Sequence, residues 1–272
     1  MPELPEIETV LNGIKPHIIH QQIKEIIIRH PTLRWPVPKN LSEKLVNQKI
    51  NNIHRRAKYL LIEFEHGTLI IHLGMSGSLR ILTHDFPPKK HDHADIKFSN
   101  QTILRFNDPR RFGAILWTDE PISSHPLIKN LGPEPLEKSF TGKSLFDKAK
   151  SRKISVKNFL MNNAIVVGVG NIYAAEALFM AKIHPETLAS KISLKRYQLL
   201  AESIKKILRE AIKQGGTTLK DFINSDGKPG YFTQFLKVYG RAGLPCVICK
   251  TKLKNKKIGQ RSTVFCEQCQ HK

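Results

Sequence analysis

Apolar residues near the start of the chain recur at helical spacing. Four of them between Ile7 and Ile14 lie at positions i, i+3, i+4 and i+7, which places them on one face of a helix. Pro5 suits a first helical turn, and Gly13 and Pro16 are typical of a helix end. The pattern therefore predicts an amphipathic helix that opens the chain.

Short runs of apolar and β-branched residues follow this helix. They are IKEIII (23–28), YLLIEF (59–64), TLIIHL (68–73), SLRIL (78–82), ADIKF (94–98) and TILRF (102–106). Turn-forming pairs such as His66-Gly67 and Ser99-Asn100 separate several of these runs. Short strands at such regular spacing predict an antiparallel sandwich or barrel of roughly 130 residues.

The pattern changes after a segment rich in proline. Residues 121–144 contain four prolines and two glycines, which indicates a boundary. Beyond it the spacing is helical, since one face of 193–214 is apolar, with Ser193 as N-cap and Gly215 as stop. A shorter helix is predicted from GVGN (168–171) to about Ile183, and the glycine-rich segment 215–232 predicts a loop.

The charge of the chain favours a polyanionic partner. Among 272 residues, 44 are lysine or arginine and 23 are acidic, which gives a net charge of +21. A surplus of this size indicates nucleic acid or an anionic membrane surface. No apolar run approaches the ~18 residues that a membrane span needs. The first ten residues carry three glutamates and no basic residue, unlike a secretory or transit peptide, so we expect a cytosolic protein.

All four cysteines lie near the C-terminal end. They form a C-x2-C pair, a spacer of sixteen residues and a second C-x2-C pair, namely Cys246, Cys249, Cys266 and Cys269. Two such pairs can supply four tetrahedral thiolate ligands for one zinc ion, and a closed set of four protein ligands is typical of a structural site. Two disulfides are the alternative, which a reducing compartment disfavours.

The spacer between the cysteine pairs is basic and contains no acidic residue. If it forms a hairpin, side-chain alternation would place four lysines on one face of a strand. They are Lys250, Lys252, Lys254 and Lys256. A solvated charged surface is one interpretation, but positive charge gathered on one face favours contact with a DNA backbone.

The N-terminus is a candidate reagent. Removal of Met1 would leave Pro2 as a secondary amine, and an α-amino group with a pKa of ~7.8 is partly unprotonated at neutral pH. Such an amine can attack a sugar C1′, displace the base and form an iminium that favours elimination, with Glu3 as acid or base. The alternative is a simple helix start, because Glu3, Glu6 and Glu8 complement a helix N-terminus. Taken alone, these residues favour the helix start.

Six motifs occur in one order along the chain. They are MPELPEIE (1–8), RRAKYLL (55–61), HLGMSGSLR (72–80), DPRRFG (108–113), GVGNIYAAEALF (168–179) and the four-cysteine module with GQR (259–261) before its second pair. The ordered set closely resembles formamidopyrimidine-DNA glycosylase, a bacterial family that repairs oxidised purines. The resemblance extends from residue 2 to the last cysteine.

The resemblance implies a catalytic role for four residues. It implies that Pro2 is the nucleophile and Glu3 the proton donor, and that Lys58 and Arg261 serve β- and δ-elimination respectively. A cation beside a leaving phosphate stabilises developing negative charge, and arginine stays protonated while doing so. Without the resemblance, Lys58 would be a surface base or phosphate clamp, and Arg261 one more basic residue of the hairpin.

The resemblance also implies how DNA is held. A glycosylase flips the target nucleotide out of the duplex, and an inserted wedge offsets the cost. Met75, Arg110 and Phe112 match the family's wedge, although spacing alone would place Met75 and Phe112 in the core. Other positions implied to contact DNA are His91, Arg110, Arg152, Asn171 and Lys220, the last in a lid over the everted base.

Local sequence gives some of these positions a physical basis. Arg152 lies in a basic stretch that extends to Lys157 and suits phosphate contacts. Asn171 opens a helix whose N-terminus favours a phosphate, although GVGN is also a plain turn and cap. His91 and His93 flank an aspartate, but two ligands in a loop do not predict a metal site.

The fold class implied is α+β, in four parts. These are an N-terminal antiparallel β-sandwich catalytic domain with a flanking helix (1–133), a linker (134–147), a helical helix–two-turns–helix domain that binds DNA (148–232) and a zinc-finger β-hairpin (238–272). The function implied is a bifunctional glycosylase and abasic-site lyase that excises 8-oxoguanine and formamidopyrimidines from double-stranded DNA. We expect a cytoplasmic, nucleoid-associated monomer with one Zn2+ per chain and DNA in a basic cleft between the β-rich domain and the helical half.

Two other functions remain as alternatives at this point. An endonuclease VIII-type glycosylase would act on oxidised pyrimidines, although Leu4, GMSGSLR and DPRRFG favour the purine branch. A non-catalytic zinc-ribbon DNA-binding protein would explain the charge and the cysteines. It would not explain Pro2 and Glu3 together with Lys58 and Arg261.

Overall fold

The computed structural model describes residues 2–217 and 232–272, which fall into two compact units. One unit comprises the chain up to Lys129 and the segment that begins at Gln214. The other comprises Asn130–Lys213 and Phe232–Lys272. Among the helices of the described residues, none combines the length and apolar content that a membrane crossing requires.

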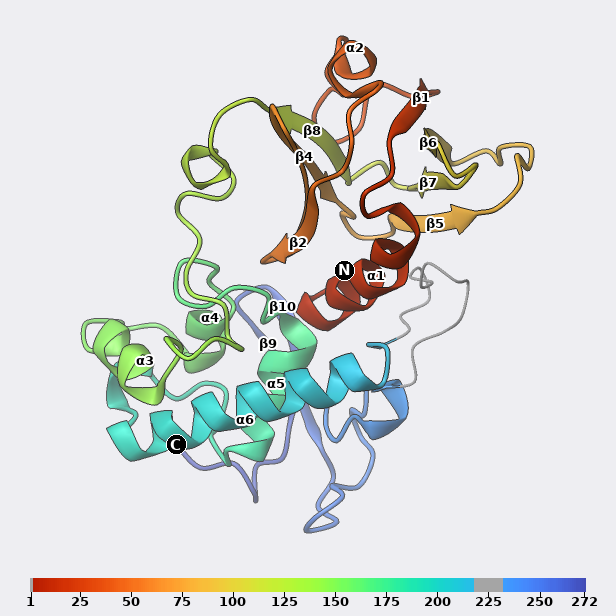
Figure 1. Cartoon of the computed structure of the whole chain (residues 1–272). Helices are drawn as coiled ribbons and strands as arrows, with labels where there is room; N and C mark the ends of the chain where they lie inside the picture. The colour runs from red at the N-terminus through yellow and green to blue at the C-terminus, as the bar shows by residue number, and fades with distance from the viewer. Residues whose placement is uncertain (1, 218–231) are drawn as a thin grey trace. The chain divides into compact units, whose positions relative to one another are not determined.

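Two antiparallel sheets of four strands form the first unit, together with α1 and α2 (Figure 1). One sheet has the strand order β1-β6-β7-β5 and the other β2-β3-β4-β8. The bounds are α1 Leu4–Ile18, β1 Ile23–Ile28, α2 Leu41–Leu45, β2 Asn52–Arg56, β3 Tyr59–Phe64, β4 Gly67–His72, β5 Ser78–Leu82, β6 Asp92–Phe98, β7 Ile103–Asn107, β8 Ala114–Thr118 and the 3-10 turn η1 Ile122–Ser124.

Both sheets and α1 contribute to a common hydrophobic core. Ile14 of α1, Leu69 of β4 and Phe106 of β7 are buried in it. The predicted sandwich and its flanking helix are therefore confirmed. The helix continues past Gly13 and includes Pro16 in its last turn, because burial of Ile14 and the following Ile18 outweighs the missing proline N–H.

The second unit is helical and ends in a β-hairpin (Figure 1). Helix α6 packs against α3 and α5, and α5 also packs against β10. The bounds are α3 Gly142–Ala149, α4 Val156–Leu160, α5 Asn171–Met180, α6 Leu194–Lys213, β9 Lys254–Ile258 and β10 Arg261–Phe265, with the 3-10 turns η2 Ala189–Lys191 and η3 Phe232–Phe235. As predicted, Ser193 caps α6 by accepting the Arg196 N–H at 3.4 Å.

Helix α3 begins inside the segment 134–147, which the sequence predicts as a linker. Thr141 and Ser144 form a capping box, in which the Thr141 hydroxyl accepts the Ser144 N–H at 3.1 Å. Gly142 is the first residue of the helix. A larger residue would not fit there, because a Cβ would lie 2.4 Å from the backbone of Gln198 in α6. This glycine, one of the two in the segment 121–144 that predicted a boundary, is therefore a close contact between two helices.

Candidate functional site

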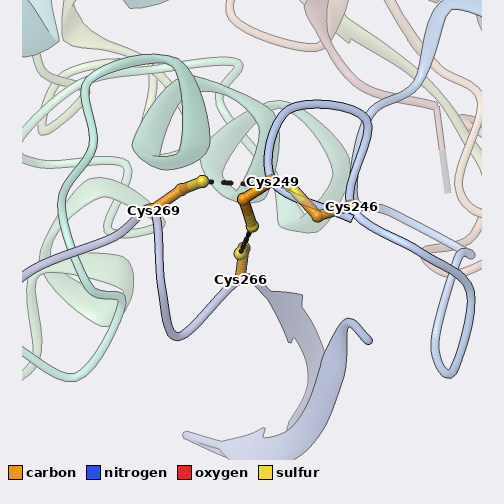
Figure 2. A group of neighbouring side chains, drawn as sticks. All are labelled: Cys246, Cys249, Cys266 and Cys269. Carbon is orange, nitrogen blue, oxygen red and sulfur yellow. Dashed lines mark hydrogen bonds between the residues drawn. The ribbon is translucent and has the colours of Figure 1, made fainter. Parts of the chain in front are cut away.

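The four cysteine sulfur atoms converge on one point (Figure 2). All four Sγ atoms lie within 4.8 Å of one another, with 3.4 Å between Cys249 and Cys266 and 4.0 Å between Cys246 and Cys269. Zinc bound at about 2.3 Å would set tetrahedral sulfur ligands about 3.8 Å apart, whereas a disulfide requires about 2.05 Å. The residues fit one structural zinc ion, and all four cysteines are free of disulfides.

The cysteine loops are packed onto the helical unit. Cys246 and Cys266 are fully buried in a cluster that includes Phe179 of α5. The Gln270 side chain accepts the Cys266 N–H and donates to the Ile183 carbonyl, both at 2.9 Å. Bound zinc would therefore fix the hairpin on α5.

The basic face of the hairpin is smaller than predicted. Strand β9 begins at Lys254, so Lys254 and Lys256 lie on it while Lys250 and Lys252 precede it. The prediction of four lysines on one strand face is wrong because Lys250 follows the first cysteine turn and Lys252 pairs with Pro245 in an isolated bridge before β9 begins. Lys254 and Lys256 form ion pairs with acidic residues outside the spacer, Glu267 and Glu186 respectively.

Arg261 stands at the exposed start of β10. Gly259 and Gln260 form the two-residue turn before it, with φ values of +52° and +65°, as in a type I′ hairpin. A Cβ on Gly259 would lie 2.2 Å from the side chain of Asn158 in α4. The turn that presents Arg261 is therefore pressed against α4, and its position is tightly defined.

Lys157 and Asn171 join α4 and α5 to the same hairpin. The Lys157 Nζ donates to the Asn171 Oδ1 and to the Thr263 Oγ1, each at 2.6 Å. The Asn171 amide donates to the Ser262 carbonyl at 3.1 Å, one residue from Arg261. The prediction that Lys157 belongs to a phosphate-contacting stretch is wrong, because its side chain is fully buried and bonded inside the protein.

The N-terminal residues are held by a capping box. Pro2 and Glu3 are buried, and α1 begins directly after Glu3. Glu3 and Glu6 cap the helix reciprocally, with the Glu3 N–H donating to Glu6 Oε2 at 2.8 Å. The other Glu6 oxygen accepts the Thr217 N–H at 2.8 Å and its hydroxyl at 2.9 Å. The helix start is thus real, and it fixes Glu3, the residue that follows Pro2 in the chain.

The turn that carries Lys58 is tied to the same helix. Lys58 follows Ala57, whose φ is +54°, in the turn between β2 and β3, and it is 9% exposed. Arg55 donates its Nε to Glu8 of α1 at 2.6 Å and an Nη to the Ala57 carbonyl at 3.0 Å. The first turns of α1 and the Lys58 turn therefore form one braced structure.

The three wedge residues line one cavity of about 730 Å³. Its lining is Thr32, Leu33, Arg34, His72, Gly74, Met75, Arg110, Arg111 and Phe112. Phe112 is 44% exposed, and the Arg110 guanidinium stacks over its ring at 4.8 Å. Met75 is half-buried. The interpretation of Met75 and Phe112 as core residues is wrong, because both line this cavity from two neighbouring turns.

His72 is a cavity residue that the sequence analysis did not single out. Burial, with further contributions from Lys58 and Arg34, lowers its pKa to about 4. Its Nδ1 accepts the Gly74 N–H at 3.0 Å, which requires an unprotonated nitrogen. The motif HLGMSGSLR contained the signal, since a histidine two residues before a glycine turn can accept from that turn.

The pKa of His72 leads to a pH prediction. A folded-state pKa below the unfolded value of ~6.5 stabilises the fold fully above that pH, and the stabilisation is lost as pH falls toward 4. Between pH 7.5 and 5 we expect this group alone to lower the free energy of unfolding by about 2 kcal/mol. An NMR titration should place the His72 midpoint near pH 4, with His72→Gln identifying the resonance. A midpoint above pH 6 would contradict the lowered pKa of His72.

Two further predicted DNA contacts, His91 and Arg152, are not among the residues that line this cavity. His91 is half-buried directly before β6, and its carbonyl accepts the Asp108 N–H at 3.0 Å. The His93 ring contacts the Asp108 carbonyl at 2.8 Å, and the described residues contain no metal-ligand cluster besides the cysteines. Arg152 is exposed after α3. Lys220 and most of the predicted loop 215–232 lie outside the described residues.

Three family models together match most of the chain. The formamidopyrimidine-DNA glycosylase N-terminal domain matches residues 1–115, and the H2TH domain of the same enzyme matches 131–223. A zinc finger found in FPG and IleRS matches 243–272. The predicted helix–two-turns–helix region and zinc-finger hairpin are therefore confirmed.

Proteins similar along their full length agree with these matches. Formamidopyrimidine-DNA glycosylase of Nitrosococcus oceani is 55% identical over 271 residues, covering 100% of both chains. That of Alcanivorax borkumensis is 57% identical over 272 residues, covering 99% of this chain and 100% of the relative.

Solved structures extend the likeness to three dimensions. The MutM (Fpg) protein of Thermus thermophilus has a TM-score of 0.88 at 33% identity, covering 99% of this chain and 98% of that one. A Lactococcus lactis FPG mutant in complex with Fapy-dG-containing DNA has a TM-score of 0.90 at 35% identity, with both chains covered completely. The chain therefore belongs to the formamidopyrimidine-DNA glycosylase family, DNA repair enzymes that excise oxidised purines and cleave the strand at the resulting abasic site.

Proposed function

We propose that Pro2, freed by removal of Met1, is the nucleophile of this glycosylase and that Glu3 is its proton donor. The observation that carries the proposal is that both residues are buried at the start of α1, where the capping box fixes Glu3 directly after Pro2. The unprotonated Pro2 nitrogen attacks C1′ of the damaged nucleotide, and the bond from C1′ to the base breaks with a proton supplied by Glu3. The Pro2 nitrogen then gives up its proton, the bond from C1′ to the ring oxygen O4′ breaks, O4′ takes up a proton to become a hydroxyl, and the iminium between Pro2 and C1′ remains.

Two cations serve the elimination steps that follow. The iminium withdraws electrons, so a proton leaves C2′ and the 3′ phosphate departs; a second elimination then releases the 5′ phosphate. We assign the first elimination to Lys58 and the second to Arg261, whose turns are braced by Arg55 and by α4 respectively. Each would stabilise charge on a departing phosphate.

The DNA-contacting residues divide by chemistry. Met75, Arg110 and Phe112 form the wedge that fills the gap left by the everted nucleotide, since they project together beside one cavity. His91, Arg152 and the N-terminal end of α5 at Asn171 contact phosphates. Lys220, in the predicted lid, contacts the everted base.

The DNA lesions that relatives bind indicate the substrate of this enzyme. MutM has been solved with DNA containing carbocyclic 8-oxo-G, and the Lactococcus lactis protein with an abasic site. We infer that this enzyme acts as a monomer on duplexes with such lesions, in the cytoplasm and at the nucleoid. The domain divisions 1–133, 134–147, 148–232 and 238–272 remain predictions.

Borohydride trapping tests this function. After mass spectrometry has confirmed that Met1 is absent, the protein is mixed with a duplex that contains 8-oxoguanine opposite cytosine, and a parallel sample receives thymine glycol. We expect a reduced covalent adduct at Pro2 with 8-oxoguanine at a rate at least about tenfold above that with thymine glycol, since only the purine would fit the site closely. Faster trapping with thymine glycol would favour the pyrimidine branch instead.

A further inference from the structure

Asp108 is a fully buried carboxylate that none of the catalytic steps uses. Its Oδ1 accepts the Ser76 hydroxyl at 2.9 Å and the Arg110 N–H at 3.3 Å. Its Oδ2 accepts the Gly113 N–H at 2.7 Å. One carboxylate thus bonds to the turn that carries Met75 and to both ends of the loop that carries Arg110 and Phe112.

The backbone of Asp108 extends these connections. Its N–H donates to the His91 carbonyl at 3.0 Å, and its carbonyl accepts the Arg111 N–H at 3.2 Å and contacts the His93 ring at 2.8 Å. Asp108 therefore also fixes the start of β6, where His91 lies. All of these groups belong to the first unit.

The two turns are in direct backbone contact. A Cβ on Gly74 would lie 2.4 Å from the Phe112 carbonyl carbon, and one on Gly113 would lie 2.7 Å from the His72 carbonyl oxygen. Such spacing leaves no room for a side chain between the turns. The two turns are held together by hydrogen bonds from the Ser76 hydroxyl and the Gly113 N–H, and both bonds are accepted by the Asp108 carboxylate.

The groups around the side chain at position 108 require a carboxylate. Both oxygens face donors, from a hydroxyl and from backbone N–H groups. A carboxylate is acceptor-only on both oxygens, whereas the amide of asparagine would present an NH2 to one of these donors. The Asp108→Asn substitution would then leave a buried donor unsatisfied, with a shift of one turn relative to the other.

We infer that Asp108 is the positioning residue that sets the geometry of the Met75–Arg110–Phe112 wedge, and thereby the efficiency of nucleotide eversion. The inference rests on the proposed role of those three residues. Asp108 is buried and hydrogen-bonded to the turns that carry the wedge residues, and it acts through them. A displacement of the order of 1 Å in such a positioning element can cost about a hundredfold in rate.

The test compares two substrates under single-turnover conditions with enzyme in excess. For Asp108→Asn we expect release of 8-oxoguanine to slow at least about tenfold. Cleavage at a preformed abasic site, where less stacking must be broken, should change less than about threefold. Ser76→Ala, which removes a single donor, should give the same pattern with a smaller effect, and Asp119→Asn, at an exposed carboxylate of the same unit, should match the wild type.

Each outcome bears on the inference separately from the proposed function. If Asp108→Asn and Ser76→Ala slowed base release and abasic-site cleavage equally, the fold would be damaged in general and the inference would be overturned. The inference would also be overturned if neither variant slowed base release. If Asp108→Asn does not fold, the Ser76→Ala ratio alone decides. A wild-type protein that neither releases 8-oxoguanine nor cleaves abasic sites would contradict the proposed function instead.

Discussion

A chain whose N-terminal amine is blocked is expected to release no 8-oxoguanine and to form no borohydride adduct. Retained Met1 or an acetyl group on Pro2 converts the Pro2 nitrogen into an amide, which can neither attack C1′ nor form the iminium. We expect base release to fall at least about a thousandfold, with strand cleavage lost in parallel. Pro2→Gly keeps an amine but loses the ring that fixes its direction, so a loss of at least about a hundredfold is expected.

The control for this prediction is Glu3→Gln. It removes the proton donor and leaves the nucleophile, so base release should fall by about 10² to 10⁴. Trapping at a preformed abasic site should persist, because no base has to be protonated there. Rapid turnover by a fully blocked protein, verified by mass spectrometry, would show that another residue is the nucleophile.

The sequence predicted six of the eight strands β1 to β8 of the β-rich unit. Strands β1 and β3 to β7 lie within two residues of the predicted runs. Strands β2 and β8 were not predicted, and they are the two edges of the sheet β2-β3-β4-β8. Strand β2 reads NIHRR and buries Ile53 alone, so its hydrophobic signal is weak.

In the site, features set by local spacing were predictable from the sequence, and features set by contacts between distant segments were not. The cysteine quartet was predictable because its spacing is local to each C-x2-C turn. The wedge cluster was accessible only through the resemblance, because it depends on register: β5 pairs with β7 so that Ser78 lies opposite Asn107. That pairing places the Met75 turn beside Asp108, and strand register cannot be read from one sequence. Lys157 was misread because a buried lysine and a surface lysine look alike in a basic stretch.

Removal of zinc is expected to abolish DNA binding and both activities. The cysteine loops have a small core, in which Cys246 and Cys266 themselves are buried against Phe179 of α5. Zinc in sites of this kind contributes about 10–16 kcal/mol of binding free energy that is coupled to folding, far more than such a core can replace. Without it the hairpin should lose its position on α5, and Arg261 its place. We expect affinity for an 8-oxoguanine duplex to fall at least about a hundredfold.

Chelation and Cys249→Ser should give this result alike, with zinc per chain measured by mass spectrometry and affinity by fluorescence anisotropy. Arg261→Ala is the matched control, because it removes the exposed side chain and leaves the zinc ligands and the Lys157 bonds to Asn171 and Thr263. It should retain one zinc ion and near-normal affinity while losing the second elimination. If zinc-free protein bound the duplex as tightly as the zinc form, the hairpin would have no part in DNA binding, and the δ-elimination assigned to Arg261 would need another residue.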